Sequence, residues 1–143
     1  LNLREIVEYK VRQAYEKIKK PVLVEDTSLR FEALGKLPWP FIKYFWQELW
    51  HEQLCRLLDG KSRRATAQSM FGYYDGKQLE IFVGELHGTI SEKPGFDNWF
   101  GWDRIFIQEW STCVRSELSE EDYKITYLKV KPIEAVRDFL LSI

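Results

Sequence analysis

The sequence of 143 residues has little of what several functional classes require. Its two cysteines, Cys55 and Cys113, lie far apart, so neither a disulfide framework nor a thiolate metal site is indicated. The two histidines, His51 and His87, are also distant and lack a spaced carboxylate, which argues against a zinc site. A formal net charge of −1 provides no long-range field that would favour nucleic acid or an anionic membrane.

Long apolar runs and glycine-rich loops are absent as well. No apolar stretch approaches the roughly 20 residues that a membrane-spanning helix needs, and nothing resembles a signal peptide. There is no glycine-rich nucleotide loop, and Ser28 and Ser69 lack a neighbouring histidine for a nucleophilic triad. These absences predict one soluble domain, residues 1–143, in the cytoplasm, with neither nucleic acid nor a membrane as partner.

The most informative segment is 21–40, PVLVEDTSLRFEALGKLPWP. Its first four residues, 21–24, are apolar and predict a buried strand whose end opens onto a polar site. The residues that follow are Glu25, Asp26, Thr27 and Ser28. Two adjacent carboxylates at a strand end could bind a divalent cation or accept a proton from water. The alternative is that Asp26 or Ser28 only caps the turn that follows.

The remaining pattern predicts an α/β protein with a mixed sheet. Helices are expected over 4–19, 40–49, 52–58 and 132–141, with another starting at Ser119, and strands over 64–74, 78–90 and 104–107. Asp75-Gly76 is a hairpin signal between two of these strands. In the last helix, the apolar stripe Ile133, Val136 and Leu140 is expected to pack on the sheet.

Two blocks of this sequence resemble the inosine triphosphate pyrophosphatase family, also called the HAM1-like family. The first combines a VEDT strand end with a turn, 35–40, that is similar to the family's G-x-x-P-G-P, although Trp39 replaces a glycine. The continuation 41–45, FIKYF, is similar to the family's Y-I-K/R-W-F. The second block, Phe100 to Asp103, is similar to the F-G-W/Y-D element. The resemblance covers the chain from about Glu5 onward.

The resemblance implies an elongated mixed sheet, flanked by helices in two lobes with a cleft between them, and a homodimer. An interface could use the aromatic residues Trp39, Phe41, Tyr44 and Trp46, although core packing is the alternative for about half of them. The implied activity is hydrolysis of a deaminated purine nucleoside triphosphate, such as that of inosine or xanthosine, to the monophosphate and pyrophosphate. The implied cofactor is Mg²⁺, or Mn²⁺ in its place.

Site residues can be transferred from the family position by position. Asp26 matches the general base and a metal ligand, Glu25 supports the metal, and Glu5 matches an upstream metal-binding glutamate. The implied substrate-binding residues are Thr27, Ser28, Phe100, Trp102, Asp103 and Lys124.

Two departures from the family pattern oppose this interpretation. The chain starts at Leu1, past the family's first strand and its T/S-x-N-x-x-K phosphate turn, so we expect an N-terminally shortened domain with weaker triphosphate binding. The family's Ser-His-Arg base reader is replaced by Leu128, Lys129 and Val130. Two hypotheses therefore remain: a divergent pyrophosphohydrolase, or a catalytically degenerate protein of the same fold that serves as a nucleotide sensor or a dimeric interaction module.

Overall fold

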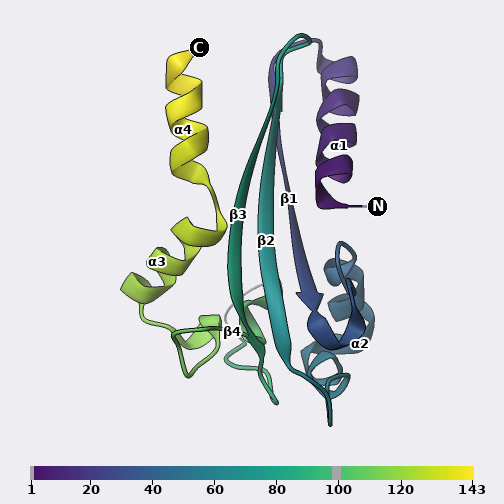
Figure 1. The fold of residues 1–143 in the computed structure, drawn as a ribbon, viewed down its shortest axis with the longest axis vertical. Helices are drawn as coiled ribbons and strands as arrows, with labels where there is room; N and C mark the ends of the chain where they lie inside the picture. Colours follow the sequence, from purple (N-terminus) through teal and green to yellow (C-terminus); the bar gives the residue numbers. More distant parts are fainter. Residues whose placement is uncertain (1, 98–100) are drawn as a thin grey trace. The chain divides into compact units, whose positions relative to one another are not determined.

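The computed structural model describes residues 2–97 and 101–143 (Figure 1). Its elements in chain order are α1 (Leu3–Ile18), β1 (Val22–Phe31), η1 (Glu32–Leu34), α2 (Ile42–Arg56), β2 (Arg64–Tyr74), β3 (Leu79–Ile90), η2 (Gly101–Arg104), β4 (Phe106–Gln108), η3 (Arg115–Glu117), α3 (Glu120–Val130) and α4 (Ile133–Ser142), where η marks a short 3₁₀ turn. The strands form one four-stranded sheet in the order β1-β2-β3-β4. The α/β class is confirmed, and the sheet is antiparallel where the sequence pattern predicted a mixed one.

Elements with a strong local signal lie where they were predicted. The helix expected over 4–19 is α1, and the strands expected over 64–74 and 78–90 are β2 and β3. Asp75 closes the hairpin between them, because its Oδ1 accepts the backbone N–H groups of Lys77 at 2.8 Å and Gln78 at 2.7 Å. The helix expected from Pro132 is α4.

The prediction for the first strand was wrong in length and in burial. β1 does not end at Val24 but continues through both carboxylates to Phe31. Its apolar start is partly open to solvent, since Leu23 is 41% exposed, whereas Ser28, Leu29 and Phe31 are fully buried. The charges do not end the strand because cationic side chains from other elements neutralise them.

The two helices expected over 40–49 and 52–58 are one element, α2, with a break. Trp50 has φ 56° and ψ 164°, which lies outside the helical region. Its side chain is 70% exposed, so the unusual backbone costs no core packing. The break falls between the two predicted helices.

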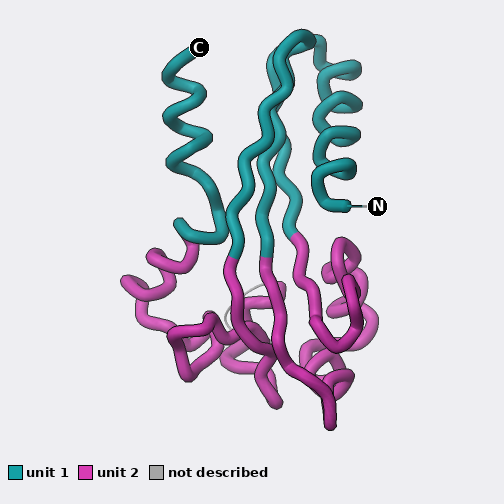
Figure 2. The backbone as a smooth tube through the Cα atoms, in the orientation of Figure 1, with its two compact units in different colours: residues 1–27, 68–85, 128–143 teal, residues 28–67, 86–127 magenta. Residues whose placement is uncertain are grey.

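The chain forms two compact units (Figure 2). Unit 1 consists of residues 1–27, 68–85 and 128–143, and unit 2 consists of residues 28–67 and 86–127. None of the described helices is both long enough and apolar enough to cross a membrane.

In unit 1, α1 and α4 cover opposite faces of the sheet. Tyr74 packs edge-on against Tyr15 of α1, with ring centroids 5.1 Å apart. Its neighbour Tyr73 packs against Phe139 of α4, with ring centroids 5.0 Å apart. Adjacent residues of a strand point to opposite faces, so the two helices lie on different sides.

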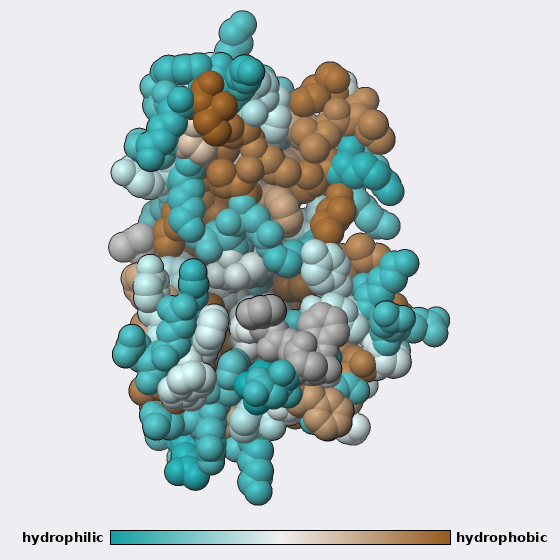
Figure 3. Space-filling model, turned by 180° about the vertical axis from the view of Figure 1, so that it is seen from behind, coloured by the Kyte–Doolittle hydropathy of each residue, from teal (hydrophilic) through white to brown (hydrophobic). Residues whose placement is uncertain are grey.

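The apolar stripe predicted for α4 is only partly buried. Val136 is buried, but Ile133 and Leu140 are 38% and 41% exposed. Phe139 makes the contact with the sheet instead, reaching both Tyr73 and Phe82. Figure 3 shows apolar side chains gathered on the surface over α4.

In unit 2, a half-buried arginine joins α2 to the end of β3. Arg63 donates from Nε to the carbonyl oxygen of Ile90 at 2.7 Å and from Nη2 to that of Cys55 at 2.8 Å. Cys55 is a buried free thiol whose pKa is raised by burial, while Cys113 is a half-buried free thiol. The apolar core of this unit contains Leu29, Phe31, Leu54, Leu58, Ile90, Ile105, Phe106 and Val114.

The aromatic residues considered for an interface fall into two groups. Trp39 is buried, and Trp46 stacks on His51 with ring centroids 5.8 Å apart. Phe41 and Tyr44 are 50% and 64% exposed. Only the second pair is available to a partner.

Gly84 of β3 lies against the backbone at the C-terminal end of α3. A Cβ atom at this position would stand 2.3 Å from the carbonyl oxygen of Val130. Because backbone cannot move aside as a flexible side chain does, we expect Gly84→Ala to lower the free energy of unfolding by about 2 kcal/mol. Urea denaturation measures this loss. The control is Val83→Ala at the 48% exposed neighbour, with an expected loss of about 0.5 kcal/mol; equal losses would contradict the packing argument.

Candidate functional site

Asp26 lies in β1 and pairs with a cation from α1. Lys10 donates from Nζ to Oδ2 of Asp26 at 2.5 Å, and the backbone N–H of Thr27 reaches Oδ1 at 3.0 Å. The Lys10 side chain is 49% exposed and that of Asp26 is 20% exposed. The pair therefore joins a carboxylate and an ammonium group that solvent can reach.

Glu25 points to the other face of the sheet. It accepts a hydrogen bond from Ser69 Oγ at 3.0 Å and forms an ion pair with Lys131. Burial lowers the pKa of Lys131, which makes a nearby carboxylate important for keeping it charged. Since Glu25 and Asp26 face opposite ways, the structure does not bring the two adjacent carboxylates to one ion.

Glu5 belongs to a helix cap, and Ser28 is buried. Glu5 completes a capping box at the start of α1, where its Oε2 accepts the backbone N–H of Asn2 at 3.1 Å. Ser28 is fully buried. Within residues 2–97 and 101–143, no three side chains of His, Cys, Asp or Glu stand close enough together to hold a metal ion.

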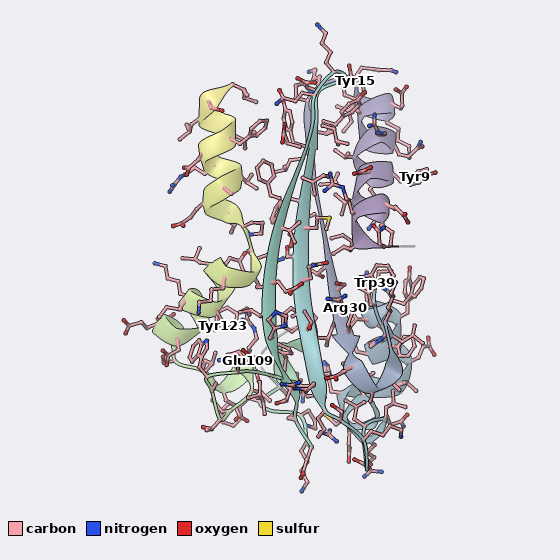
Figure 4. The ribbon with its side chains drawn as sticks, viewed as in Figure 1. Tyr9, Tyr15, Arg30, Trp39, Glu109 and Tyr123 are labelled. Carbon is pink, nitrogen blue, oxygen red and sulfur yellow. The ribbon has the colours of Figure 1, made fainter. Side chains whose placement is uncertain are left out.

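Asp103 forms a second cluster, in unit 2. It follows Trp102 in η2, and each of its carboxylate oxygens accepts a hydrogen bond from another segment. Arg115 of η3 donates from Nε to Oδ1 at 2.8 Å. Tyr123 of α3, labelled in Figure 4, donates from its hydroxyl to Oδ2 at 2.8 Å. Segments that are 12 and 20 residues further along the chain thus converge on this carboxylate.

Arg115 is the most deeply buried charge in this cluster, with a side chain only 2% exposed. Its Cζ stands 4.8 Å from the ring centroid of Tyr123 and 5.4 Å from that of Trp102, so two aromatic faces flank the guanidinium. Trp102 is itself packed edge-on against Phe106. Three rings and an ion pair therefore fix the Asp103 carboxylate.

Tyr123 is held in its protonated form. Burial, together with the charge and hydrogen bond of Asp103, raises the pKa of Tyr123 to about 12. Lys124 is the next residue of α3 and is exposed. It therefore lies about 100° further round the helix than Tyr123. Phe100, the first residue of the F-G-W-D element, lies outside the described residues.

His51 of α2 holds the start of η2. Its Nε2 lies 2.6 Å from the carbonyl oxygen of Gly101, which can only accept, so Nε2 carries the proton. Nδ1 is then the acceptor for Arg104 Nη1 at 3.4 Å. Burial lowers the pKa of His51, so the neutral ring is favoured. This histidine orders the segment that leads into Trp102.

Sequence reasoning missed four of these residues: Lys10, His51, Arg115 and Tyr123. Lys10 lies on the polar face of a predicted helix, where a lysine is ordinary. His51 was weighed only as a metal ligand. Nothing in the local pattern around Arg115 distinguishes a buried arginine from an exposed one, because its partner is a contact made in three dimensions.

The comparison with protein families decides the affiliation. A model of the Ham1 family matches residues 1–136. The chain belongs to the Ham1 family. The resemblance drawn from the two sequence blocks is therefore confirmed.

Curated relatives and a solved structure agree with this assignment. A protein of Hyperthermus butylicus named dITP/XTP pyrophosphatase is 36% identical over 121 residues, which are 84% of this Ham1 family chain and 64% of that relative. A protein of Emericella nidulans named inosine triphosphate pyrophosphatase is 41% identical over 143 residues, or 98% of this chain and 76% of that relative. The Staphylococcus aureus Ham1 protein superposes with a TM-score of 0.83 at 22% identity, covering 99% of this chain and 78% of that structure. This structural likeness shows a shared fold.

The lowered pKa of His51 predicts an acid-sensitive contribution to stability. A depressed folded-state pKa means that the unfolded chain binds the proton more readily, so the contribution is present above about pH 6.5 and is lost as the pH falls. We expect the wild type to lose more stability between pH 7.5 and 5 than His51→Gln, measured by urea denaturation. The matched control is His87→Gln, which removes the exposed histidine and should retain the wild-type slope. Parallel slopes for all three proteins would show that His51 is not held neutral.

The raised pKa of Tyr123 predicts the opposite dependence at alkaline pH. The folded state keeps the phenol proton up to about pH 12, whereas the unfolded chain releases it near its ordinary value of 10.0. The contribution is therefore fully present below pH 10 and is lost as the pH rises towards 12. Unfolding free energies at pH 8 to 11 should fall more steeply in the wild type than in Tyr123→Phe. Tyr127→Phe, one turn further along α3 at a 37% exposed ring, serves as the control and should behave as the wild type does.

Proposed function

We propose that the chain is a nucleoside triphosphate pyrophosphohydrolase, which splits a deaminated purine nucleoside triphosphate into the monophosphate and pyrophosphate. The observation that carries the proposal is the solvent-accessible ion pair between Lys10 and Asp26. It supports the proposal because an ammonium group can bind phosphate and a carboxylate can activate water. The printed names of the relatives, dITP/XTP pyrophosphatase and inosine triphosphate pyrophosphatase, support the same reaction.

The pair suggests an order of events. In the free protein Lys10 neutralises Asp26. When a triphosphate arrives, its anionic oxygens compete for the Lys10 ammonium group, and Asp26 becomes available to orient a water molecule. The water oxygen attacks the α-phosphorus and its proton passes to Asp26. The bond from the α-phosphorus to the bridging oxygen breaks, and pyrophosphate leaves with that oxygen.

Mg²⁺ is the cofactor that the family resemblance implies, with Mn²⁺ as an alternative. Magnesium commonly binds through one or two carboxylates together with substrate phosphates and water, so it needs no protein cage. Asp26 is the residue whose exposure and position fit such a role, while Glu25 and Glu5 are engaged with Lys131 and Asn2. When bound, the ion would neutralise the charge that develops on the departing pyrophosphate.

Base recognition is assigned to the cluster in unit 2. Asp103 presents a carboxylate that remains 14% exposed, beside the aromatic surface of Trp102. A carboxylate accepts hydrogen bonds but donates none when it is ionised. It therefore suits a base that presents an N–H group, as the 6-oxopurines do at N1.

The competing function is a nucleotide sensor or dimeric interaction module without catalysis. The specific observation that favours an interaction surface is the exposed pair Phe41 and Tyr44, which matches the expectation of a homodimer. A hydrolysis assay separates the two functions directly.

We expect the full chain with Mg²⁺ to release pyrophosphate from inosine or xanthosine triphosphate, and Asp26→Asn to reduce the rate by about 10²-fold or more. Lys10→Met should reduce kcat/KM by roughly tenfold or more, because a charge-assisted phosphate contact is lost. The control is Glu8→Gln, which breaks the exposed ion pair with Arg4 on the same helix and should stay within twofold of the wild type.

Circular dichroism of each variant establishes that it is folded. Absence of release from inosine, xanthosine and the four common triphosphates in the wild type would exclude the proposed reaction. The sensor or interaction module would then be the function to pursue.

A further inference from the structure

The Asp103 carboxylate is held at both of its oxygens by side chains from other segments. Two donors from η3 and α3 hold the two oxygens of one carboxylate, each at 2.8 Å. One of the donors, Arg115, is a charge with only 2% of its side chain exposed. Removing a guanidinium group from water is unfavourable unless other groups stabilise its charge. For Arg115 these groups are the Asp103 carboxylate and two aromatic faces.

The compensation is incomplete. Arg115 Nη1 is buried and makes no hydrogen bond to any residue of the described part of the chain. An unsatisfied buried donor is unfavourable, and a well-packed apolar side chain in its place is often neutral or stabilising. Stability alone is therefore a weak reason for an arginine at this position. What the arginine adds is orientation, because its Nε donates to Oδ1 of Asp103 at 2.8 Å and so holds the carboxylate in one direction.

Tyr123 holds the second oxygen of the Asp103 carboxylate. Its backbone lies in the first turn of α3, where its N–H donates to the carbonyl oxygen of Ser119 at 2.8 Å. Ser119 caps the helix by accepting the backbone N–H of Asp122 at 3.1 Å. The hydroxyl of Tyr123 is thus aimed by a capped helix end. The phenol remains protonated at neutral pH because its pKa is raised to about 12, so it acts as a donor.

We propose that Arg115 and Tyr123 are positioning residues for base selection: together they hold the Asp103 carboxylate in place as the acceptor for the N1–H group of a 6-oxopurine. This inference rests on the proposed function and extends it to residues that do not touch the substrate. Each carboxylate oxygen has two lone pairs, so the two internal donors leave acceptor capacity for a ligand. An acceptor placed against N1 receives the N1–H of a 6-oxopurine, whereas adenine presents a lone pair at N1 and carries its donors on the 6-amino group instead.

The Asp103 cluster offers a replacement for the family's Ser-His-Arg base reader, which this sequence lacks. Leu128, Lys129 and Val130 stand where the family resemblance led us to expect a Ser-His-Arg base reader. Of these three, Val130 is buried, so it is not available to a ligand. Selection in this chain would then depend on the acceptor at Asp103 and on the two side chains that hold it.

The test uses two nucleoside monophosphates, which the proposed reaction does not consume. Affinities of the full chain for inosine monophosphate and adenosine monophosphate are measured by calorimetry, and their ratio is the base preference. We expect Tyr123→Phe, which removes only the hydroxyl, to reduce the preference by about tenfold. Arg115→Met should reduce it at least as much; where that variant fails to fold, Tyr123→Phe alone carries the test. Tyr127→Phe should leave the preference unchanged.

A double variant tests whether Tyr123 acts through Asp103. We expect Asp103→Asn to abolish the preference, so adding Tyr123→Phe should change the ratio no further; a ratio that changes again in the double variant would show that Tyr123 does not act through Asp103. A preference retained in folded Tyr123→Phe, or a wild type that binds neither monophosphate, would overturn the inference. Pyrophosphate release by the same preparations reports separately on the proposed reaction, so each idea can fail without the other.

Discussion

The alternation of side chains along a strand is the constraint on which this structure depends. It sends Asp26 to α1 and its neighbour Glu25 to Ser69 and Lys131. The same alternation sends Tyr74 and Tyr73 to two different helices. A pair of carboxylates that looks like one site in the sequence thus lies in two separate environments, and the lysine that pairs with Asp26 is the more exposed of the two partners.

A second regularity is that three of the candidate carboxylates, Asp26, Glu25 and Asp103, each pair with a cation from a different segment. Lys10 of α1 serves Asp26, and the segment between α3 and α4 supplies Lys131 for Glu25. Arg115 does the same for Asp103 within unit 2. The degree of burial separates these pairs. The Lys10 side chain is 49% exposed, so a ligand can exchange with this pair, whereas the Arg115 side chain is 2% exposed and serves to hold Asp103, which itself remains 14% exposed.

How far the sequence predicts this fold depends on how local each signal is. The helix α1, the hairpin closed by Asp75 and the helix α4 follow from periodicity, turn chemistry and proline placement, and these signals act over a few residues. β1 was predicted too short because adjacent charges normally end a strand, and nothing nearby reveals the lysines that neutralise them. The family resemblance singled out Asp26 and Asp103 as candidates from the sequence, whereas Arg115 and Tyr123 meet Asp103 only through tertiary contacts that no local pattern reveals.

The two thiols of unit 2 have different access to solvent. Cys55 is fully buried beneath Arg63, and its raised pKa keeps it in the unreactive thiol form, whereas Cys113 is half-buried. A thiol-reactive dye therefore modifies the folded chain first at Cys113. Modification of Cys55 requires the core of unit 2 to open, so its rate of labelling measures how often that opening occurs. Cys113 can thus carry a probe in the folded chain, and the labelling of Cys55 reports local unfolding.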